Sequence, residues 1–280
     1  MIAANAAPWP STSSLVLTQI RGQLRTFWRT PISAFFTIVF PLMVLLLFGL
    51  IFGNDTFESP FGPITSRQFY APALGAFSAV SATYTNLAIT TTIRRDEGVL
   101  KRVRSTPLPP VIWMTGAIGA AIVLAFLGVA LSLTVGVLFY GVEVELAKMP
   151  AAVVTFLVGT AAFAAMGLAL SALAKSGQAA PALTNATLLP LAMISNVFVP
   201  IRDDAPTWLT TAANIFPLRP FVDAFSTAFA PATDAPAFEW GKLAIVAAWG
   251  VLGLVVALRK FTWEPVGPAR RIRRSTAGPA

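Results

Sequence analysis

The side chains that most often carry catalytic chemistry are missing from this chain. It contains no histidine and no cysteine, so it has no histidine general base, no cysteine nucleophile and no imidazole–thiolate metal site. No phosphate-binding loop of the form G-x-x-x-x-G-K-[ST] occurs either. Its nearest counterparts are Gly241-Lys242, which leucine follows, and Lys175-Ser176, which alanine precedes. We therefore expect a chain that is not an enzyme and that binds no cofactor of its own.

The composition is typical of a membrane protein. Of the 280 residues, 56% are hydrophobic and only 11% are charged, and the mean hydropathy is +0.72. A soluble domain carries about 25% charged residues. The net charge of +8 lies in loops beside long apolar runs, which is typical of cytoplasmic loops rather than of a nucleic-acid-binding domain. These features predict an all-α integral membrane protein with no nucleic-acid partner.

Six apolar stretches are each long enough to cross the hydrocarbon core, which needs about 20 residues in a helix. They divide the chain into a cytoplasmic N-terminus over 1–32, a transmembrane domain over 33–258 and a basic cytoplasmic tail over 259–280. Because only four residues separate the fourth and fifth spans, we expect these two spans to form a tight helical hairpin. The six predicted spans are 33–53, 70–93, 112–139, 151–174, 179–200 and 240–258.

Lysine and arginine are distributed unequally between the two sides of this predicted bundle. Fifteen of the 20 fall in the segments 1–32, 94–111, 175–178 and 259–280, which share one side. By the positive-inside rule this side is cytoplasmic, and both termini lie there. On the other side, we expect the apolar segment 206–225 to form short helices at the outer membrane surface, because its three prolines interrupt a continuous span.

An amphipathic pattern precedes the first span. Apolar residues recur at helical spacing, and three arginines recur every fourth residue beside them: Leu17, Ile20, Leu24 and Phe27, with Arg21, Arg25 and Arg29. Ser13 or Ser14 could cap the start of such a helix. The pattern predicts a surface helix on the inner membrane face. An ordinary arginine anchor beside the membrane is the alternative.

Uncharged polar side chains are the remaining candidates for a function inside the membrane. No Asp, Glu, Lys or Arg lies deep in a predicted span, which argues against a proton- or ion-coupled carrier and against a membrane hydrolase. The second and fifth spans are instead rich in serine, threonine and asparagine. The alternative to a functional lining is hydrogen bonding between helices, which is common in membrane bundles. The hypothetical substrate path includes Ser81, Thr85, Asn86, Asn185 and Asn196.

Glycine spacing predicts that some of these helices pack closely, because small residues let backbones approach. One pair forms a G-x-x-x-G pattern, another lies eight residues apart, and a third lies three apart: Gly49 and Gly53, Gly159 and Gly167, Gly250 and Gly253.

The predicted cytoplasmic loop over 94–110 has the pattern of a docking helix. Val99, Leu100 and Val103 form a small apolar face, and Glu97 and Gly98 precede it. Basic residues occupy the other positions, and a proline at 107 ends the helix. A short helix held between two membrane spans is suited to dock in a groove of a cytoplasmic partner. A basic loop with incidental helicity is an alternative that the residues leave open.

This loop also resembles a known family signature. The similarity extends over nearly the whole chain, with further matching stretches at 196–200, 206–209, 216–218, 223–224 and 261–265. One departure is Val99, where many members have threonine. The family is that of ABC-2 type transporter permeases, in particular the drug-resistance branch typified by the daunorubicin-exporter permease, and the loop residues that resemble it are Glu97-Gly98-Val99-Leu100-Lys101-Arg102-Val103 and Thr106-Pro107-Leu108.

The resemblance implies an ABC-2 (type V) exporter-like fold: six transmembrane helices and an N-terminal surface helix, in the plasma (inner) membrane of a bacterium. It implies that a separate ATP-binding-cassette ATPase binds ATP and Mg, and that a second permease copy or a paralogue completes the pathway among membrane lipids. The residues that would couple the permease to the ATPase are Glu97, Gly98, Val99, Leu100, Val103, Thr106 and Pro107.

We therefore expect the membrane subunit of an exporter that moves a hydrophobic, drug-like or lipid substrate outward. A lipid or glycan exporter of the same family is the first alternative. A secondary transporter is the second, and the uncharged spans count against it.

Overall fold

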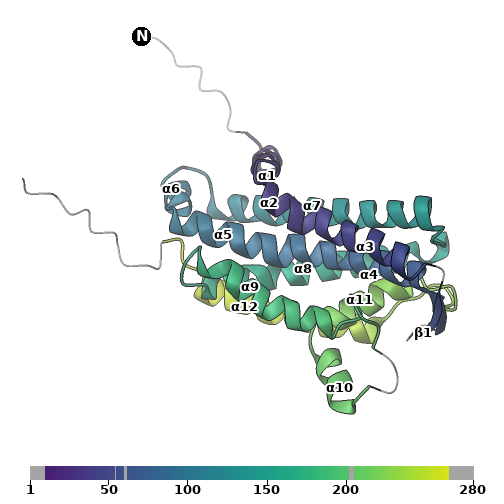
Figure 1. The fold of residues 1–280 in the computed structure, drawn as a ribbon. Helices are drawn as coiled ribbons and strands as arrows, with labels where there is room; N and C mark the ends of the chain where they lie inside the picture. Colours follow the sequence, from purple (N-terminus) through teal and green to yellow (C-terminus); the bar gives the residue numbers. More distant parts are fainter. Residues whose placement is uncertain (1–9, 54, 60–61, 202–204, 265–280) are drawn as a thin grey trace, which may run out of the picture.

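The computed structural model describes residues 10–53, 55–59, 62–201 and 205–264, and most of these residues are helical. The long helices lie side by side in one bundle, and α1 (Thr12–Trp28) is seen nearly end-on where it crosses them (Figure 1). Most of the predicted basic tail lies outside the described residues.

Among the described residues, four helical stretches are long and apolar enough to cross a membrane. They correspond within a few residues to the predicted spans 33–53, 112–139, 151–174 and 240–258. The stretches are Pro31–Ile51, made of α2 (Pro31–Ala34), η1 (Phe35–Val39) and α3 (Phe40–Ile51); Pro110–Tyr140, which is α7; Leu146–Leu173, made of η3 (Leu146–Lys148) and α8 (Met149–Leu173); and Trp240–Lys260, which is α12.

Local backbone chemistry sets several of these helix ends. Prolines stand in the first turns of α2, α7 and α8, where a missing N–H costs nothing. The helix α7 ends at Gly141, whose φ of 66° is left-handed. The Gly141 N–H bonds to the Val137 carbonyl at 3.2 Å, so the last turn is closed.

The second predicted span is part of a longer helical run. α4 (Ser66–Val80), the π-helical η2 (Ser81–Asn86) and α5 (Leu87–Asp96) follow one another without a gap. Thr65 begins the run, because its side chain accepts a hydrogen bond from the Gln68 N–H. All but one residue of α4 are buried, so this helix forms the centre of the bundle. The run is not among the four stretches given above.

Within the fifth predicted span, 179–200, the helix ends earlier than expected. The helix α9 covers only Ala179–Met193, and the chain then turns. Asn196 accounts for this difference, because its backbone is left-handed with a φ of 56°, which cannot continue a helix. At 1.5 Å per residue, α9 is about 22 Å long, shorter than the roughly 30 Å hydrocarbon core. Five residues join α8 to α9, as the predicted hairpin requires.

The N-terminal helix forms where it was predicted but packs differently. Its cap is Ser11, which accepts a hydrogen bond from the Ser14 N–H, so the expectation of Ser13 or Ser14 was wrong. The apolar stripe turns toward α7, with Ile20 lying against Gly119 and Phe27 buried. The arginines beside the stripe remain exposed. Much of the stripe is therefore used for packing within the chain rather than for a membrane surface.

The segment after α9 contains the short helices that its prolines predict. They are α10 (Thr207–Ile215) and α11 (Leu218–Thr227), with Pro206 and Pro217 at their N-caps. Every residue of α11 is buried, whereas α10 projects from the bundle (Figure 1). A two-stranded antiparallel hairpin, β1 (Thr56–Ser59) and β2 (Gly62–Thr65), precedes α4.

Glycines mark close helix contacts at several of the predicted positions, but Gly53 is an exception, because a Cβ there would meet nothing within 4 Å. A Cβ at Gly250 or Gly253 of α12 would lie 2.7–2.8 Å from Ala162 or Met166 of α8. A Cβ at Gly167 of α8 would lie 2.8 Å from the carbonyl oxygens of Thr83 and Tyr84 in η2. These three glycines let α8 pack directly against the backbones on both sides.

Candidate functional site

The predicted docking loop forms a corner between α5 and a short helix, α6 (Val99–Arg104), which lies at one end of the bundle (Figure 1). Gly98 is the N-cap of α6 and has a left-handed φ of 72°. A Cβ at Gly98 would meet nothing within 4 Å. Gly98 is therefore required by the backbone conformation and not by a close approach of another segment.

Arg95 lies under this corner and is completely buried, with 0% of its surface exposed. Its Nη1 donates to the Ser171 carbonyl at 2.7 Å, and its Nη2 donates to the Ala174 carbonyl. These two carbonyls are at the C-terminal end of α8, where helix carbonyls lack partners and the helix dipole favours a cation. Arg95 thus caps α8 from the end of α5.

Asp96 makes a second connection to the same region. Its Oδ2 accepts a hydrogen bond from the Gly177 N–H at 2.6 Å. Gly177 lies in the loop between α8 and α9, and a Cβ there would lie 3.1 Å from the backbone of Ile93. The end of α5 is therefore bound to the α8–α9 loop by two adjacent charged side chains. We call Arg95 and Asp96 together the α5 clamp.

The sequence analysis did not identify the α5 clamp. In the sequence, Arg95 and Asp96 are two further charged residues of the loop 94–110, directly before the family signature. Their partners are 76 to 81 positions away along the chain, and no local pattern connects them. The available signal was their position directly after the last apolar residue of a span, where long charged side chains can reach neighbouring helix ends.

Contrary to the sequence prediction, Leu100 does not lie on an exposed docking face. It is 0% exposed and packs in a small apolar cluster with Leu87 and Trp113. Val103 is partly buried against the same cluster. Because this apolar face packs on the chain's own helices, Leu100 has no surface with which to fill a groove of a partner.

The outer surface of the corner is polar and mainly basic. Glu97 and Thr106 are exposed, as is Pro107, whereas Val99 is half-buried. The Thr106 hydroxyl donates to the Val103 carbonyl at 2.6 Å and so closes the end of α6. Three cations complete the surface: Lys101, Arg102 and Arg104 are all exposed. This surface suits a partner with acidic or carbonyl groups better than one with an apolar groove.

The five residues of the hypothetical substrate path do not form one lining in a single chain. Ser81 is buried, and Asn185 is exposed on α9. The Thr85 hydroxyl and the Asn86 Oδ1 are buried without a hydrogen-bond partner among the described residues. Asn196 lies elsewhere and is occupied by its own hydrogen bonds, to Asp223 and to the Ile201 N–H.

Several other polar groups of the spans bond between segments, as the alternative interpretation expected. Ser78 donates to the Thr37 carbonyl at 2.8 Å, and Ser132 donates to the Ala71 carbonyl at 2.9 Å. Tyr84 and the Thr187 hydroxyl are 2.7 Å apart, which links η2 to α9. These side chains therefore connect segments of the bundle.

A buried ionic network lies where the chain turns after α9. The Asn196 Nδ2 donates to the Asp223 Oδ1 at 2.9 Å, and the Arg219 Nε is 3.4 Å from the Asp223 Oδ2. Burial raises the pKa of the Asp223 carboxyl, while Asn196, Lys242 and Arg219 act in the opposite direction. The network fixes α11 against this turn. Among the described residues, no group of three or more acidic side chains could hold a metal ion.

Comparison with known proteins agrees with this architecture. The family model for the ABC-2 type transporter matches residues 14–230, from the first turn of α1 to just beyond α11. A comparison with curated proteins gave no match. The matched region covers well over half of the chain and includes the α5–α6 corner, the α5 clamp and three of the four long apolar helices. The chain belongs to the ABC-2 type transporter family and is the membrane-embedded permease component of an ABC transporter.

Proposed function

We propose that this permease is the membrane subunit of an ATP-driven exporter that moves a hydrophobic, drug-like or lipid substrate out of a bacterial cell. Permeases of this family normally work with a separate ATP-binding-cassette ATPase, which would bind ATP and Mg. The loop signature at 97–108 supports the drug-resistance branch. The uncharged spans support a conduit for apolar substrates rather than an ion-coupled carrier.

The observation that carries this proposal is the α5 clamp behind the exposed face of α6. An ATPase that holds Lys101 and Arg102 would move α6 and the end of α5 together, because Gly98 joins them in one tight turn. Arg95 and Asp96 would pass this movement to the end of α8 and to the α8–α9 loop. The coupling element is therefore the whole α5–α6 corner, with Glu97, Thr106 and Pro107 at its surface.

Six crossings follow if two further segments span the membrane. The run Ser66–Asp96 has 31 residues, about 46 Å at 1.5 Å per residue, which exceeds the hydrocarbon thickness. The helix α9 needs the turn that follows it to reach across. Both termini are then cytoplasmic, and a second permease copy or a paralogue pairs with this chain, as in a type V exporter.

Transport in inside-out membrane vesicles tests this function directly. The permease and its ATPase are produced together, and ATP-dependent uptake is measured for a fluorescent anthracycline and for a fluorescent phospholipid. Uptake of the anthracycline supports the drug-exporter proposal, and uptake of the phospholipid alone supports the lipid-exporter alternative. Vesicles with an ATPase that cannot hydrolyse ATP are the control. ATP-dependent loss of preloaded substrate from the same inside-out vesicles, instead of uptake, would contradict export.

A further inference from the structure

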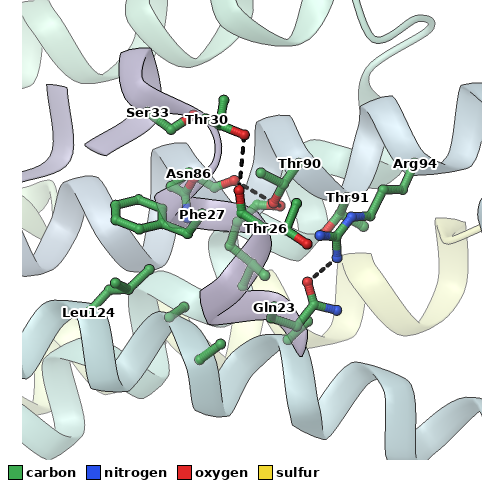
Figure 2. Close-up of a pocket in the computed structure, with 14 residues that line it drawn as sticks. Gln23, Thr26, Phe27, Thr30, Ser33, Asn86, Thr90, Thr91, Arg94 and Leu124 are labelled. Atoms are coloured by element: carbon green, nitrogen blue, oxygen red, sulfur yellow. Dashed lines mark hydrogen bonds between the residues drawn. The ribbon is translucent and has the colours of Figure 1, made fainter. Parts of the chain in front are cut away.

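A small pocket, lined by both polar and apolar side chains, lies where α1 meets α5 and α7 (Figure 2). Its volume is about 40 Å³, which has room for the polar atoms of a headgroup or a few waters but not for a drug-sized molecule, whose sites are roughly 300–1,000 Å³. Gln23 and Thr26 line it from α1, and Thr91 and Arg94 line it from α5. The pocket therefore suits a small polar group.

Two of the residues that line this pocket each have a buried oxygen atom without a hydrogen-bond partner among the described residues. These atoms are the Asn86 Oδ1 and the Thr91 hydroxyl, and Thr91 is only 1% exposed. Buried polar atoms in folded proteins are almost always hydrogen-bonded. The amide oxygen can only accept a hydrogen bond, so its partner must be a donor. The pocket thus requires an occupant that donates to Asn86 and bonds to Thr91.

Arg94 supplies the one positive charge that lines the pocket. One of its Nη1 hydrogens goes to the Gln23 Oε1, which leaves most of its donors available (Figure 2). No described carboxylate lies within salt-bridge distance of Arg94. Glu97 acts on Arg94 electrostatically without contacting it, so this half-buried guanidinium still has donors for an anion, and phosphate groups match its geometry.

The surroundings of the pocket are those of a lipid headgroup region. Thr26 and Thr30 line the pocket and are exposed, so the mouth opens along the C-terminal part of α1. Trp28 and Ile32 each follow one of these threonines by two positions in the sequence. They are 57% and 66% exposed, which provides apolar surface for acyl chains. A free phosphate ion would use none of the apolar surface.

We propose that this pocket binds the headgroup of an anionic phospholipid of the phosphatidylglycerol type from the inner leaflet. Its phosphate accepts hydrogen bonds from Arg94 and Thr91, and a glycerol hydroxyl donates to the Asn86 Oδ1. The bound lipid joins α1 to α5 next to the α5–α6 corner. This proposal depends on the cytoplasmic position of α1 and not on which substrate is transported.

Lipid titration of the purified full-length chain in detergent tests the proposal. The thermal unfolding midpoint is measured against phosphatidylglycerol, phosphatidylcholine and inorganic phosphate. Phosphatidylglycerol should raise the midpoint at concentrations where the other two have no effect. Arg94→Gln should weaken the apparent affinity for phosphatidylglycerol at least tenfold. Arg25→Gln removes the same charge from exposed α1 surface outside the pocket and should change the affinity less than twofold.

The second variant is Thr91→Val, which keeps the shape of the side chain and removes the unpartnered hydroxyl. The lipid-free protein should be at least as stable as the wild type, while the affinity for phosphatidylglycerol falls severalfold. An unchanged affinity in Thr91→Val would overturn the proposal even if Arg94→Gln did not fold. Equal losses in Arg94→Gln and Arg25→Gln would indicate general surface attraction, and equal binding of inorganic phosphate would indicate a free-anion site. Either result would also overturn it.

Discussion

Arg95 shows how a single residue can connect two distant parts of this permease. A fully buried guanidinium is costly unless its donors are used, and here two of them cap the carbonyls at the end of α8. The same charge would have little effect on the exposed surface of α6. Burial and partners, rather than residue type, therefore distinguish Arg95 from its basic neighbours.

The substitution Arg95→Gln should loosen the end of α8 without unfolding the bundle. It leaves buried carbonyls without their donors, at about 1–3 kcal/mol for each unpaired group. Hydrogen–deuterium exchange in lipid nanodiscs should become faster at residues 171–178, and ATP-driven transport should fall. Arg21→Gln is the matched control, because Arg21 is exposed on α1, away from the α5–α6 corner. Unchanged exchange at 171–178 would show that the α5 clamp does not hold α8.

Leu100 should behave as a core residue and not as an interface residue. Leu100→Ala removes a fully buried side chain and should lower the free energy of unfolding by about 2–5 kcal/mol. Lys101→Ala, next to it on the exposed face, should change that energy by less than about 0.5 kcal/mol. Thermal unfolding in detergent gives both values. A stable Leu100→Ala variant that fails to bind the ATPase would instead restore the docking role that the sequence predicted.

At the scale of elements, the charged face of α6 is the docking surface that we propose for the ATPase. The double variant Lys101→Glu/Arg102→Glu reverses two exposed charges and should reduce the amount of copurifying ATPase at least tenfold at low salt. The wild-type complex should also weaken as salt rises, because exposed charge pairs are screened. The control Arg21→Glu/Arg25→Glu makes the same change on α1 and should retain the ATPase. Full copurification of the α6 variant would exclude this face as the docking surface.

Helix packing around α8 gives a second prediction at this scale. Gly167→Ala places a Cβ 2.8 Å from two backbone oxygens of η2, which cannot move as a flexible side chain can. We expect a loss of about 1–3 kcal/mol in the free energy of unfolding. Gly22→Ala in α1 meets nothing within 4 Å and should be neutral or stabilising by up to about 1 kcal/mol. Equal unfolding midpoints for the two variants would contradict the close contact of α8 with η2.

The elements that the sequence predicted best are those whose ends carry their own signals. α7, α8 and α12 are uninterrupted apolar runs with proline, glycine or charged residues at their ends, and their bounds agree within a few residues. The helix expected in the fifth span was too long, because the apolar pattern continues past Met193. The left-handed Asn196, which follows the helix, is held by Asp223 from 27 positions away. Local patterns contain no information on such pairs.

The same limit applies to the candidate site. Periodicity identified the apolar face of α6 correctly, but it could not tell whether that face packs on this chain or on a partner. It also could not find the α5 clamp, which exists only when α5 and α8 are packed together. The pocket near Arg94 combines residues from α1, α2, η2, α5 and α7, and only Asn86 among them was a candidate from the sequence. The contacts between distant segments that enter our proposals could therefore be found only in the structure.

At the scale of the whole molecule, the two ends of the bundle differ in chemistry. One end carries α6 with its basic surface and the α5 clamp. The other carries the β1–β2 hairpin, and the two ends are well separated in Figure 1. The central helical run from Ser66 to Asp96 connects them, so a displacement at the α5–α6 corner acts directly on the most buried helix of the bundle. This arrangement suits a protein that transmits work from one membrane face to the other.

Thiol labelling on intact cells tests this orientation, and the absence of native cysteine makes single-cysteine variants unambiguous. Thr207→Cys lies at the exposed start of α10, and Gln178→Cys is exposed in the α8–α9 loop. The imbalance of lysine and arginine places the first outside and the second in the cytoplasm. A membrane-impermeant maleimide should therefore label Thr207→Cys in intact cells and label Gln178→Cys only after the cells are opened.

The reverse pattern would mean that the molecule has the opposite orientation, and α6 would then face away from every cytoplasmic ATPase. Labelling of both positions in intact cells would mean that the chain crosses the membrane an even number of times between them. In that case α9 and the turn after it form no crossing, and the chain does not have six crossings.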